Sequence, residues 1–166
     1  IRLSLVGSEM CIRDRPLADA VRSDLRRSRS AVENIIPNET WAPDYVAQLM
    51  PKFEQKITGI AMNVPVANGS CIDLTTEMAI MPTIEEVNRS FQKASRETLT
   101  GLVRYTEDPI VSSDAIGGGE TMLFDSKATM IASEKLLKTV AWFDNGWGFA
   151  SRILELAESY SQLERA

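Results

Sequence analysis

Hydrophobic residues recur with two different spacings along this chain. In residues 41–50 and 84–96 they return every three or four positions, as Val87 and Phe91 do, which predicts two amphipathic helices. A third helix of this kind is predicted to begin near Trp147. Short runs rich in β-branched, aromatic or alternating residues predict strands instead, and these runs are 57–66, 70–78, 101–106, 121–125, 128–131 and 138–144.

The residues at the ends of these runs favour the same assignment. Thr40 is a good N-cap for the first helix, and Thr83 with Glu86 three positions later forms a capping box for the second. Asn68 and Gly69, between the first two strand runs, are typical of a hairpin turn. Strands outnumber helices and follow one another closely. We therefore predict an α+β fold, a largely antiparallel mixed sheet with helices packed on one face.

The first fifteen residues do not share these patterns. They keep no sustained helical or strand period, and the run EMCIRDR resembles the in-frame translation of a transposon end used to prepare DNA for sequencing. We interpret residues 1–15 as a non-native or disordered leader derived from an adapter, the alternative being a natural, poorly ordered N-terminus. Residues 16–166 are then expected to form part of one domain.

Composition excludes several classes of function. The chain has 166 residues, a net charge of −5 and 44% hydrophobic residues, which is typical of a single globular domain. No apolar stretch is long enough to span a membrane, the acidic balance argues against a nucleic-acid partner, and two cysteines suit a reducing cytoplasm. There is no histidine, so imidazole-based nucleophilic pairs, bases and zinc sites are excluded, and no metal-ligand spacing is found.

Two short segments carry candidate binding chemistry. Arg26, Arg27 and Arg29 lie within residues 24–37, a segment without a steady period that we predict to be irregular; guanidinium groups so clustered suit either a phosphate or a solvated charge cluster. Asn145 lies where the last strand gives way to a helix, and its amide suits either a ligand carboxamide or a helix cap. The residues alone leave both pairs of alternatives open.

Several longer strings carry a resemblance to one family. They are DLRRSRSAVENIIP (24–37), AMNVPVANGSCIDLT (61–75), YTEDPIVSSD (105–114), LFDSKAT (123–129) and VAWFDNGWGFASRILEL (140–156). In this order and spacing they resemble the C-terminal catalytic domain of glyceraldehyde-3-phosphate dehydrogenase, a glycolytic enzyme. The resemblance covers nearly all of the chain from Pro16 to Leu156.

The resemblance implies an activity and its participants. Enzymes of this family oxidise an aldehyde phosphate through a cysteine thioester, pass hydride to NAD held by an N-terminal Rossmann domain, and release the acyl group to phosphate. Their nucleophilic cysteine, in a Ser-Cys-Thr-Thr-Asn string, and their histidine base belong upstream of Pro16. We therefore expect this chain to contain no catalytic residue and to be inactive alone. The resemblance further implies a cytoplasmic homotetramer with no membrane or nucleic-acid partner, and it leaves NADP open as the cofactor.

Individual residues match binding positions of the family. Arg27 matches the arginine that binds the substrate's phosphate, and Thr40 matches a threonine of the second, inorganic-phosphate site. Asn145 matches the asparagine that contacts the nicotinamide carboxamide. The resemblance implies that Arg27 and Asn145 share one cleft.

Three departures from the family pattern keep other functions open. Trp41 replaces the glycine that follows the threonine, Asn63 replaces an arginine, and Phe149 replaces a common tyrosine. The first two weaken the expected phosphate contacts. The alternatives are a dehydrogenase for another sugar aldehyde, such as erythrose 4-phosphate, and a non-catalytic oligomerisation or regulatory module of the same fold.

Overall fold

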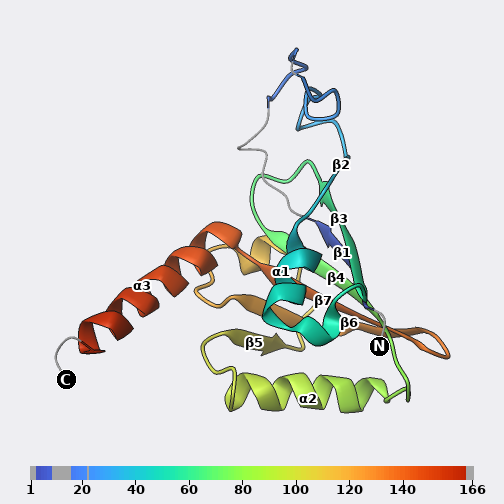
Figure 1. The fold of residues 1–166 in the computed structure, drawn as a ribbon, viewed down its shortest axis with the longest axis vertical. Coiled ribbons are helices and arrows are strands. Elements are labelled where there is room, and N and C mark those ends of the chain that lie inside the picture. The colour runs from blue at the N-terminus through green and yellow to red at the C-terminus, as the bar shows by residue number, and fades with distance from the viewer. Residues whose placement is uncertain (1–2, 9–15, 22, 164–166) are drawn as a thin grey trace.

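One seven-stranded sheet organises the molecule, as shown by a computed structural model that describes residues 3–8, 16–21 and 23–163 (Figure 1). The strands lie in the order β2-β3-β1-β4-β7-β6-β5, and only the pairs β1/β3 and β5/β6 are parallel. The strands are β1 (Leu3–Ser8), β2 (Ile36–Asn38), β3 (Ile57–Asn63), β4 (Ser70–Glu77), β5 (Val103–Thr106), β6 (Met122–Ser133) and β7 (Leu136–Phe143). The helices are α1 (Ala42–Leu49), α2 (Ile84–Arg96) and α3 (Asn145–Leu163), with short 3-10 turns at Pro51–Phe53 and Ser112–Ala115.

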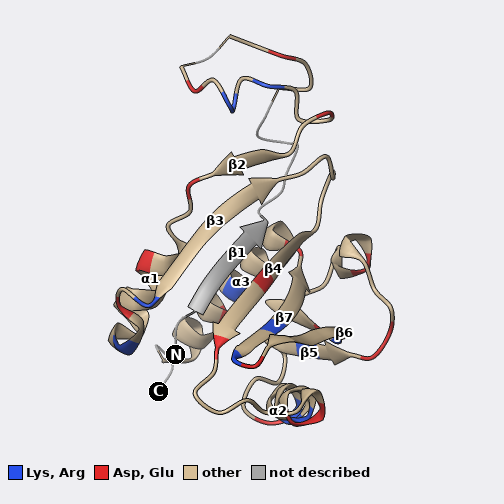
Figure 2. Cartoon of the chain, turned by 90° about the vertical axis from the view of Figure 1, so that its right-hand side faces the viewer, with Lys and Arg blue, Asp and Glu red and all other residues tan. Residues whose placement is uncertain are grey.

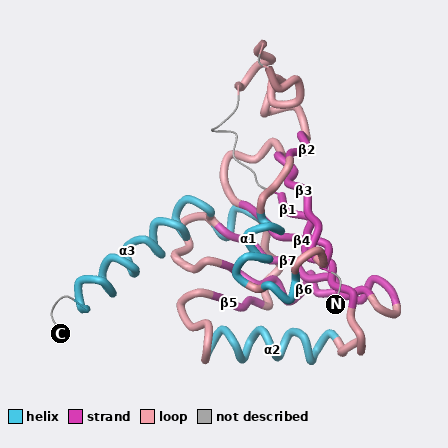
Figure 3. The backbone as a smooth tube through the Cα atoms, viewed as in Figure 1, coloured by secondary structure: helices cyan, strands magenta, loops and turns pink. Residues whose placement is uncertain are grey.

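The described helices lie on one side of this sheet. Helix α1 contacts β3, and α2 contacts β5 and β6. Figure 2 looks onto the opposite face and shows no described helix in front of β3 and β4, and Figure 3 shows α2 and α3 extending beyond the strands. The predicted α+β fold is therefore confirmed.

Aromatic stacking forms the centre of the core under α2. Phe124 of β6 is 1% exposed, and its ring stacks on that of Phe91 at a centroid distance of 3.8 Å. Val87 from the same helix is also buried. The helix begins as predicted, because Thr83 Oγ1 accepts from Glu86 N while Glu86 Oε2 accepts from Thr83 N.

The centre of the sheet differs from the prediction. Residues 3–8, expected to be a leader without regular structure, form β1, which pairs in parallel with β3 and antiparallel with β4. Since β1 lies between β3 and β4, the hairpin predicted at Asn68-Gly69 is wrong, although both strands form close to the predicted bounds. The adapter origin of residues 1–15 stays a prediction, and 1–2 and 9–15 lie outside the described residues.

Strand β6 also differs from the prediction, because the two strands expected at 121–125 and 128–131 are one. Its pairing with β7 is irregular between Asp125 and Met130. Asp125 is buried at this irregularity, where its carboxylate accepts from Lys127 N, Ala128 N and Trp142 Nε1. These three hydrogen bonds satisfy the buried Asp125 side chain and thereby stabilise the irregular pairing within β6. The sequence pattern broke at this point and therefore predicted two strands instead of one.

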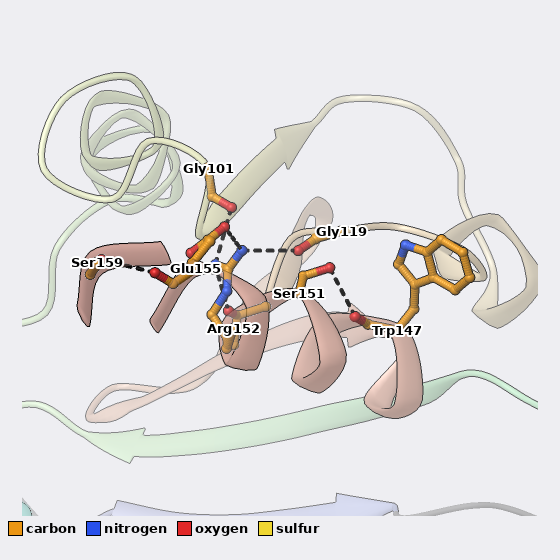
Figure 4. A network of polar contacts seen from close by, with 8 residues as sticks. Gly101, Gly119, Trp147, Ser151, Arg152, Glu155 and Ser159 are labelled. Carbon is orange, nitrogen blue, oxygen red and sulfur yellow. Dashed lines mark hydrogen bonds and ion pairs between the residues drawn. The ribbon is translucent and has the colours of Figure 1, made fainter. Parts of the chain in front are cut away.

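Helix α3 extends away from the sheet, and Gly148 is its one buried residue among those the structure describes (Figure 1). Arg152 attaches the helix to the neighbouring loops, because its guanidinium donates to Gly119 O and Gly101 O and pairs with Glu155 (Figure 4). Among the described residues, no helix is long and apolar enough to cross a membrane.

Candidate phosphate-binding site

A pocket of about 900 Å³ lies beside β3, between the segment 24–27 and the start of α1. Arg27 and Thr40, which are distant in the sequence, both line it. The structure thus brings together two of the three predicted site residues.

A tight turn presents the arginines of this pocket. Asp24 Oδ1 accepts from Arg26 N and from Arg27 N, both at 3.0 Å, so the carboxylate fixes the backbone that carries both guanidinium groups. The surrounding loop is closed by buried Ser30, whose N donates to Asp19 Oδ1 and whose Oγ donates to Leu17 O. Of the segment 24–37 predicted to be irregular, residues 24–35 are irregular, because these local polar contacts replace a helical ladder, whereas Ile36 and Pro37 begin β2.

The guanidinium groups of Arg26 and Arg27 differ from that of their neighbour Arg29. Arg29 forms an ion pair with Asp19 at 3.2 Å, whereas within the described part of the chain neither Arg26 nor Arg27 forms one. Both pocket arginines are exposed. They are therefore free to accept an anionic ligand.

The opposite end of the pocket has a different chemistry. Thr40 Oγ1 accepts from Ala42 N at 3.2 Å, but the N-cap of α1 is Trp41 rather than Thr40, so the predicted N-cap is wrong by one residue. Trp41 and Tyr45, residues that are 70% and 62% exposed, line this end. Glu39 lines it as well and adds a carboxylate.

Asn63, the second departure from the family pattern, ends β3 opposite Ile36 and does not line this pocket. Its Oδ1 is buried and has no hydrogen-bond partner within the described residues. A buried oxygen without a donor is destabilising by about 1–3 kcal/mol. Asn63 thus leaves a buried acceptor without a donor at the position where the resemblance implies an arginine.

A second candidate region is the junction between β7 and α3. Asp144 is 6% exposed and accepts from Asn68 Nδ2, Gly117 N and Trp147 N, each at 3.0 Å. Burial raises the pKa of Asp144, but these hydrogen bonds and one from Gly146 N lower it more, so the carboxyl pKa lies below its ordinary value. The carboxylate therefore connects three segments that are distant in the sequence, at Asn68, Gly117 and Trp147.

Asn145 follows this carboxylate and is exposed at the first position of α3. It does not line the pocket that contains Arg27 and Thr40. The reason is topological: β7 lies three strands from β3, which corresponds to about 14 Å at a strand spacing of about 4.8 Å. This pocket is not the shared cleft that was expected, and the nicotinamide role of Asn145 stays a prediction.

The pocket also contains residues that sequence reasoning did not assign to a site. Glu39 and Tyr45 were not considered, and Trp41 was noted only as a departure from the family pattern. These residues could have been assigned to the site from the sequence, because they lie next to Thr40, within one turn of the predicted start of the helix. In the described part of the chain, no group of three acidic, cysteine or histidine residues is placed to hold a metal ion.

Comparison with known proteins identifies the family. The sequence model of the family described as "Glyceraldehyde 3-phosphate dehydrogenase, C-terminal domain" matches residues 5–145. The chain belongs to this family. Its resemblance strings, its α+β sheet and the pocket that contains Arg27 and Thr40 are thus features of a member of this dehydrogenase domain family.

Individual relatives agree with this assignment. The chain is 43% identical over 143 residues to glyceraldehyde-3-phosphate dehydrogenase 2 of Streptomyces avermitilis, covering 86% of the chain and 43% of the relative. It is 44% identical over 144 residues to the enzyme of Streptomyces coelicolor, with coverage of 86% and 43%. It is 39% identical over 144 residues to that of Geobacillus stearothermophilus, with coverage of 87% and 43%. The chain thus spans less than half the length of these relatives.

Proposed function

We propose that this chain is the substrate-phosphate-binding part of a dehydrogenase that oxidises glyceraldehyde 3-phosphate. The observation that carries the proposal is the pocket in which Arg27 and Thr40 meet. Membership of the family supports the reaction class, and the free guanidinium groups support recognition of a phosphate monoester.

In this proposal Arg27 has a defined part in the reaction. Its guanidinium, fixed by the Asp24 turn, binds the substrate phosphate and thereby orients the aldehyde carbon toward a thiolate supplied elsewhere in the parent protein. Arg26 on the same turn adds a second positive charge. The chain itself has no histidine and no Ser-Cys-Thr-Thr-Asn string, so we expect no dehydrogenase activity from it alone.

NAD is the proposed cofactor of the parent protein, and it supplies the hydride acceptor when bound. Asn145 fits the predicted contact with its carboxamide, because the side chain is exposed and has no hydrogen-bond partner within the described residues. The hydrogen bonds accepted by Asp144 hold in place the backbone from which this amide extends. A preference for NADP would be set by residues outside this chain.

Assembly into a cytoplasmic homotetramer is a further part of the proposal. The segment 17–35 carries large apolar side chains that are strongly exposed: Leu17, Val21, Leu25 and Ile35. Helix α3 carries a second exposed apolar set, which includes Leu154 and Tyr160. Exposed apolar groups of this extent support packing against other parts of a larger assembly.

A binding titration tests the phosphate assignment. Glycerol 3-phosphate, an unreactive analogue of the substrate, should bind the purified chain, and Arg27→Ala should weaken its affinity about tenfold, the loss expected for one charge-assisted contact. Arg29→Ala is the matched control, because Arg29 lies on the same segment but is paired with Asp19. Equal affinity in the wild type and Arg27→Ala would refute the role of Arg27.

A spectrophotometric assay tests the expected inactivity. The purified chain should give no formation of NADH from glyceraldehyde 3-phosphate, NAD and phosphate, because no thiolate–histidine pair is present. Measurable turnover by this chain would contradict the assignment of its catalytic groups to another part of the parent.

A further inference from the structure

We propose that Asn68 is a site of spontaneous deamidation, at which the backbone nitrogen of Gly69 attacks the side-chain amide carbon. A bond forms between Gly69 N and Asn68 Cγ, the bond from Cγ to Nδ2 breaks, and the proton of Gly69 N leaves with Nδ2 as ammonia. Water then opens the five-membered succinimide and yields aspartate or isoaspartate. The reaction needs only water besides the chain itself, and this modification goes beyond the proposed function.

The structure places the attacking nitrogen beside the group that it attacks. Gly69 N donates to Oδ1 of the preceding residue, Asn68, at 2.8 Å. Since a carbonyl bond is about 1.2 Å long, Gly69 N lies no farther than about 4 Å from Asn68 Cγ. Reacting atoms about 3–3.5 Å apart form a near-attack conformer, so a small movement of the side chain completes the approach.

The sequence contains a second Asn-Gly pair, Asn145-Gly146, whose geometry is different. Asn145 begins α3, and Gly146 N is engaged by the Asp144 carboxylate. In an α-helix each Cβ tilts toward the N-terminal end, and therefore away from the peptide nitrogen that follows. Asn145 is exposed whereas Asn68 is half-buried, so solvent exposure alone would rank the reactivity of the two pairs in the opposite order.

Conversion to aspartate would place two carboxylates against each other. Asn68 Nδ2 donates to Asp144 Oδ2 at 3.0 Å, and Asp144 is 6% exposed. The reaction replaces this donor by a negatively charged oxygen, so a hydrogen bond is lost and a like charge takes its place. Because buried charges are screened less than exposed ones, the two carboxylates would repel each other strongly.

Isoaspartate would have a second effect, because its main chain runs through the side-chain carboxyl group and is one carbon longer. Gly69 packs closely against the 3-10 turn at Ser112–Ala115, where an added Cβ would lie 2.6 Å from Ser112 O. A longer main chain cannot keep this contact unchanged. Either product therefore weakens the junction centred on Asp144. A resulting loss of the nicotinamide contact of Asn145 rests on the proposed function, whereas the modification itself does not.

Peptide mapping by mass spectrometry tests the proposal directly, because deamidation raises the mass of a peptide. When the folded chain is incubated in mildly alkaline buffer, we expect Asn68 to be converted at least about tenfold faster than Asn145, since its attacking nitrogen is within reach. In concentrated urea both pairs lose their folded geometry, and the two rates should agree within about twofold. No conversion of Asn68 in the folded chain, or conversion of Asn145 at an equal or higher rate, would overturn the proposal.

Two variants test the consequence of the modification. Asn68→Asp reproduces the charged product, and Asn68→Ala is its matched control, because both remove the donor to Asp144 and only the first adds a charge. We expect the urea midpoint of Asn68→Asp to lie below that of Asn68→Ala at neutral pH, and failure of Asn68→Asp alone to fold would support the same repulsion. Equal midpoints would refute the repulsion. Neither experiment involves a phosphate ligand, so failure here leaves the proposed function standing.

Discussion

The pocket at Arg27 and the junction at Asp144 use polar side chains in opposite ways. At the junction, a buried carboxylate accepts hydrogen bonds from Asn68, Gly117 and Trp147, and three segments meet on it. At the pocket, the guanidinium of Arg27 is exposed and has no ion pair among the described residues. The first arrangement stabilises the fold, and the second leaves charge available for a ligand. Removing the Asp144 carboxylate should therefore lower the free energy of unfolding, whereas removing the Arg27 guanidinium should lower ligand affinity.

The largest expected loss of stability comes from Asp144→Ala. The change leaves Asn68 Nδ2, Gly117 N and Trp147 N without their acceptor, and buried donors left unpaired are destabilising by about 1–3 kcal/mol each before relaxation. We expect the free energy of unfolding in urea to fall by about 3 kcal/mol. A loss below about 0.5 kcal/mol, the range of ordinary surface substitutions, would show that the junction is not a structural hub.

The second largest loss of stability is expected at Gly69, in the turn that places Asn68 beside Asp144. Gly69 has φ +90°, and a Cβ there would lie 2.6 Å from Ser112 O, whereas Gly101 has φ +77° and open space around it. Gly69→Ala should therefore destabilise by about 2 kcal/mol, against about 1 kcal/mol for the control Gly101→Ala, which carries backbone strain alone. Equal thermal shifts in both variants would contradict the close approach at Gly69.

The ionisation of Asp144 gives a smaller, pH-dependent effect. Hydrogen bonds hold its folded pKa below the ordinary value of about 3.9, so the charged form stabilises the fold above that pH. This contribution is lost as pH falls through the folded pKa. The stability difference between wild type and Asp144→Asn, measured by urea unfolding from about pH 6 down to about pH 3, should shrink below about pH 4. If the stability difference between wild type and Asp144→Asn grew toward acid pH, the pKa of Asp144 would be raised by folding rather than lowered.

The smallest effect on stability is expected at the pocket. Arg27→Ala should change the free energy of unfolding by less than about 0.5 kcal/mol, because the side chain is exposed and unpaired within the described residues. The same variant should lose ligand affinity, as proposed above. A stability loss comparable to that of Asp144→Ala would make Arg27 a structural residue and remove the contrast between the two regions.

Local chemistry explains which parts of the fold were predictable. The Thr83–Glu86 capping box forms both of its hydrogen bonds, and α1 begins beside Thr40, because each depends on neighbours within a few residues. The position of β1 between β3 and β4 depends on pairing with residues more than fifty positions away. Nothing in the alternation of residues 57–78 distinguishes a hairpin from two strands separated by a third.

The candidate site shows the same limit. Arg27 and Thr40 were predicted to belong to two different phosphate sites; in the structure both line one pocket, because the chain between them returns to the sheet edge through β2, which pairs with β3. Asn145 was expected in the same cleft, but the order of strands places its helix beyond β7. The chemistry that each side chain offers could be predicted from its residue type. The distance between Arg27 and Asn145 depends instead on the order of the strands, which short-range sequence patterns do not determine.

The most direct test of the central claim, that the Arg27 pocket binds the phosphate end of the substrate, is a titration of the ¹⁵N-labelled chain with glycerol 3-phosphate followed by amide chemical shifts. We expect the largest shifts at the pocket-lining residues of two segments, Asp24, Arg26 and Arg27 in the first and residues 38–41 in the second, with little change in α2 and β6. Shifts centred on α2 and β6, or no shifts at saturating ligand, would contradict it.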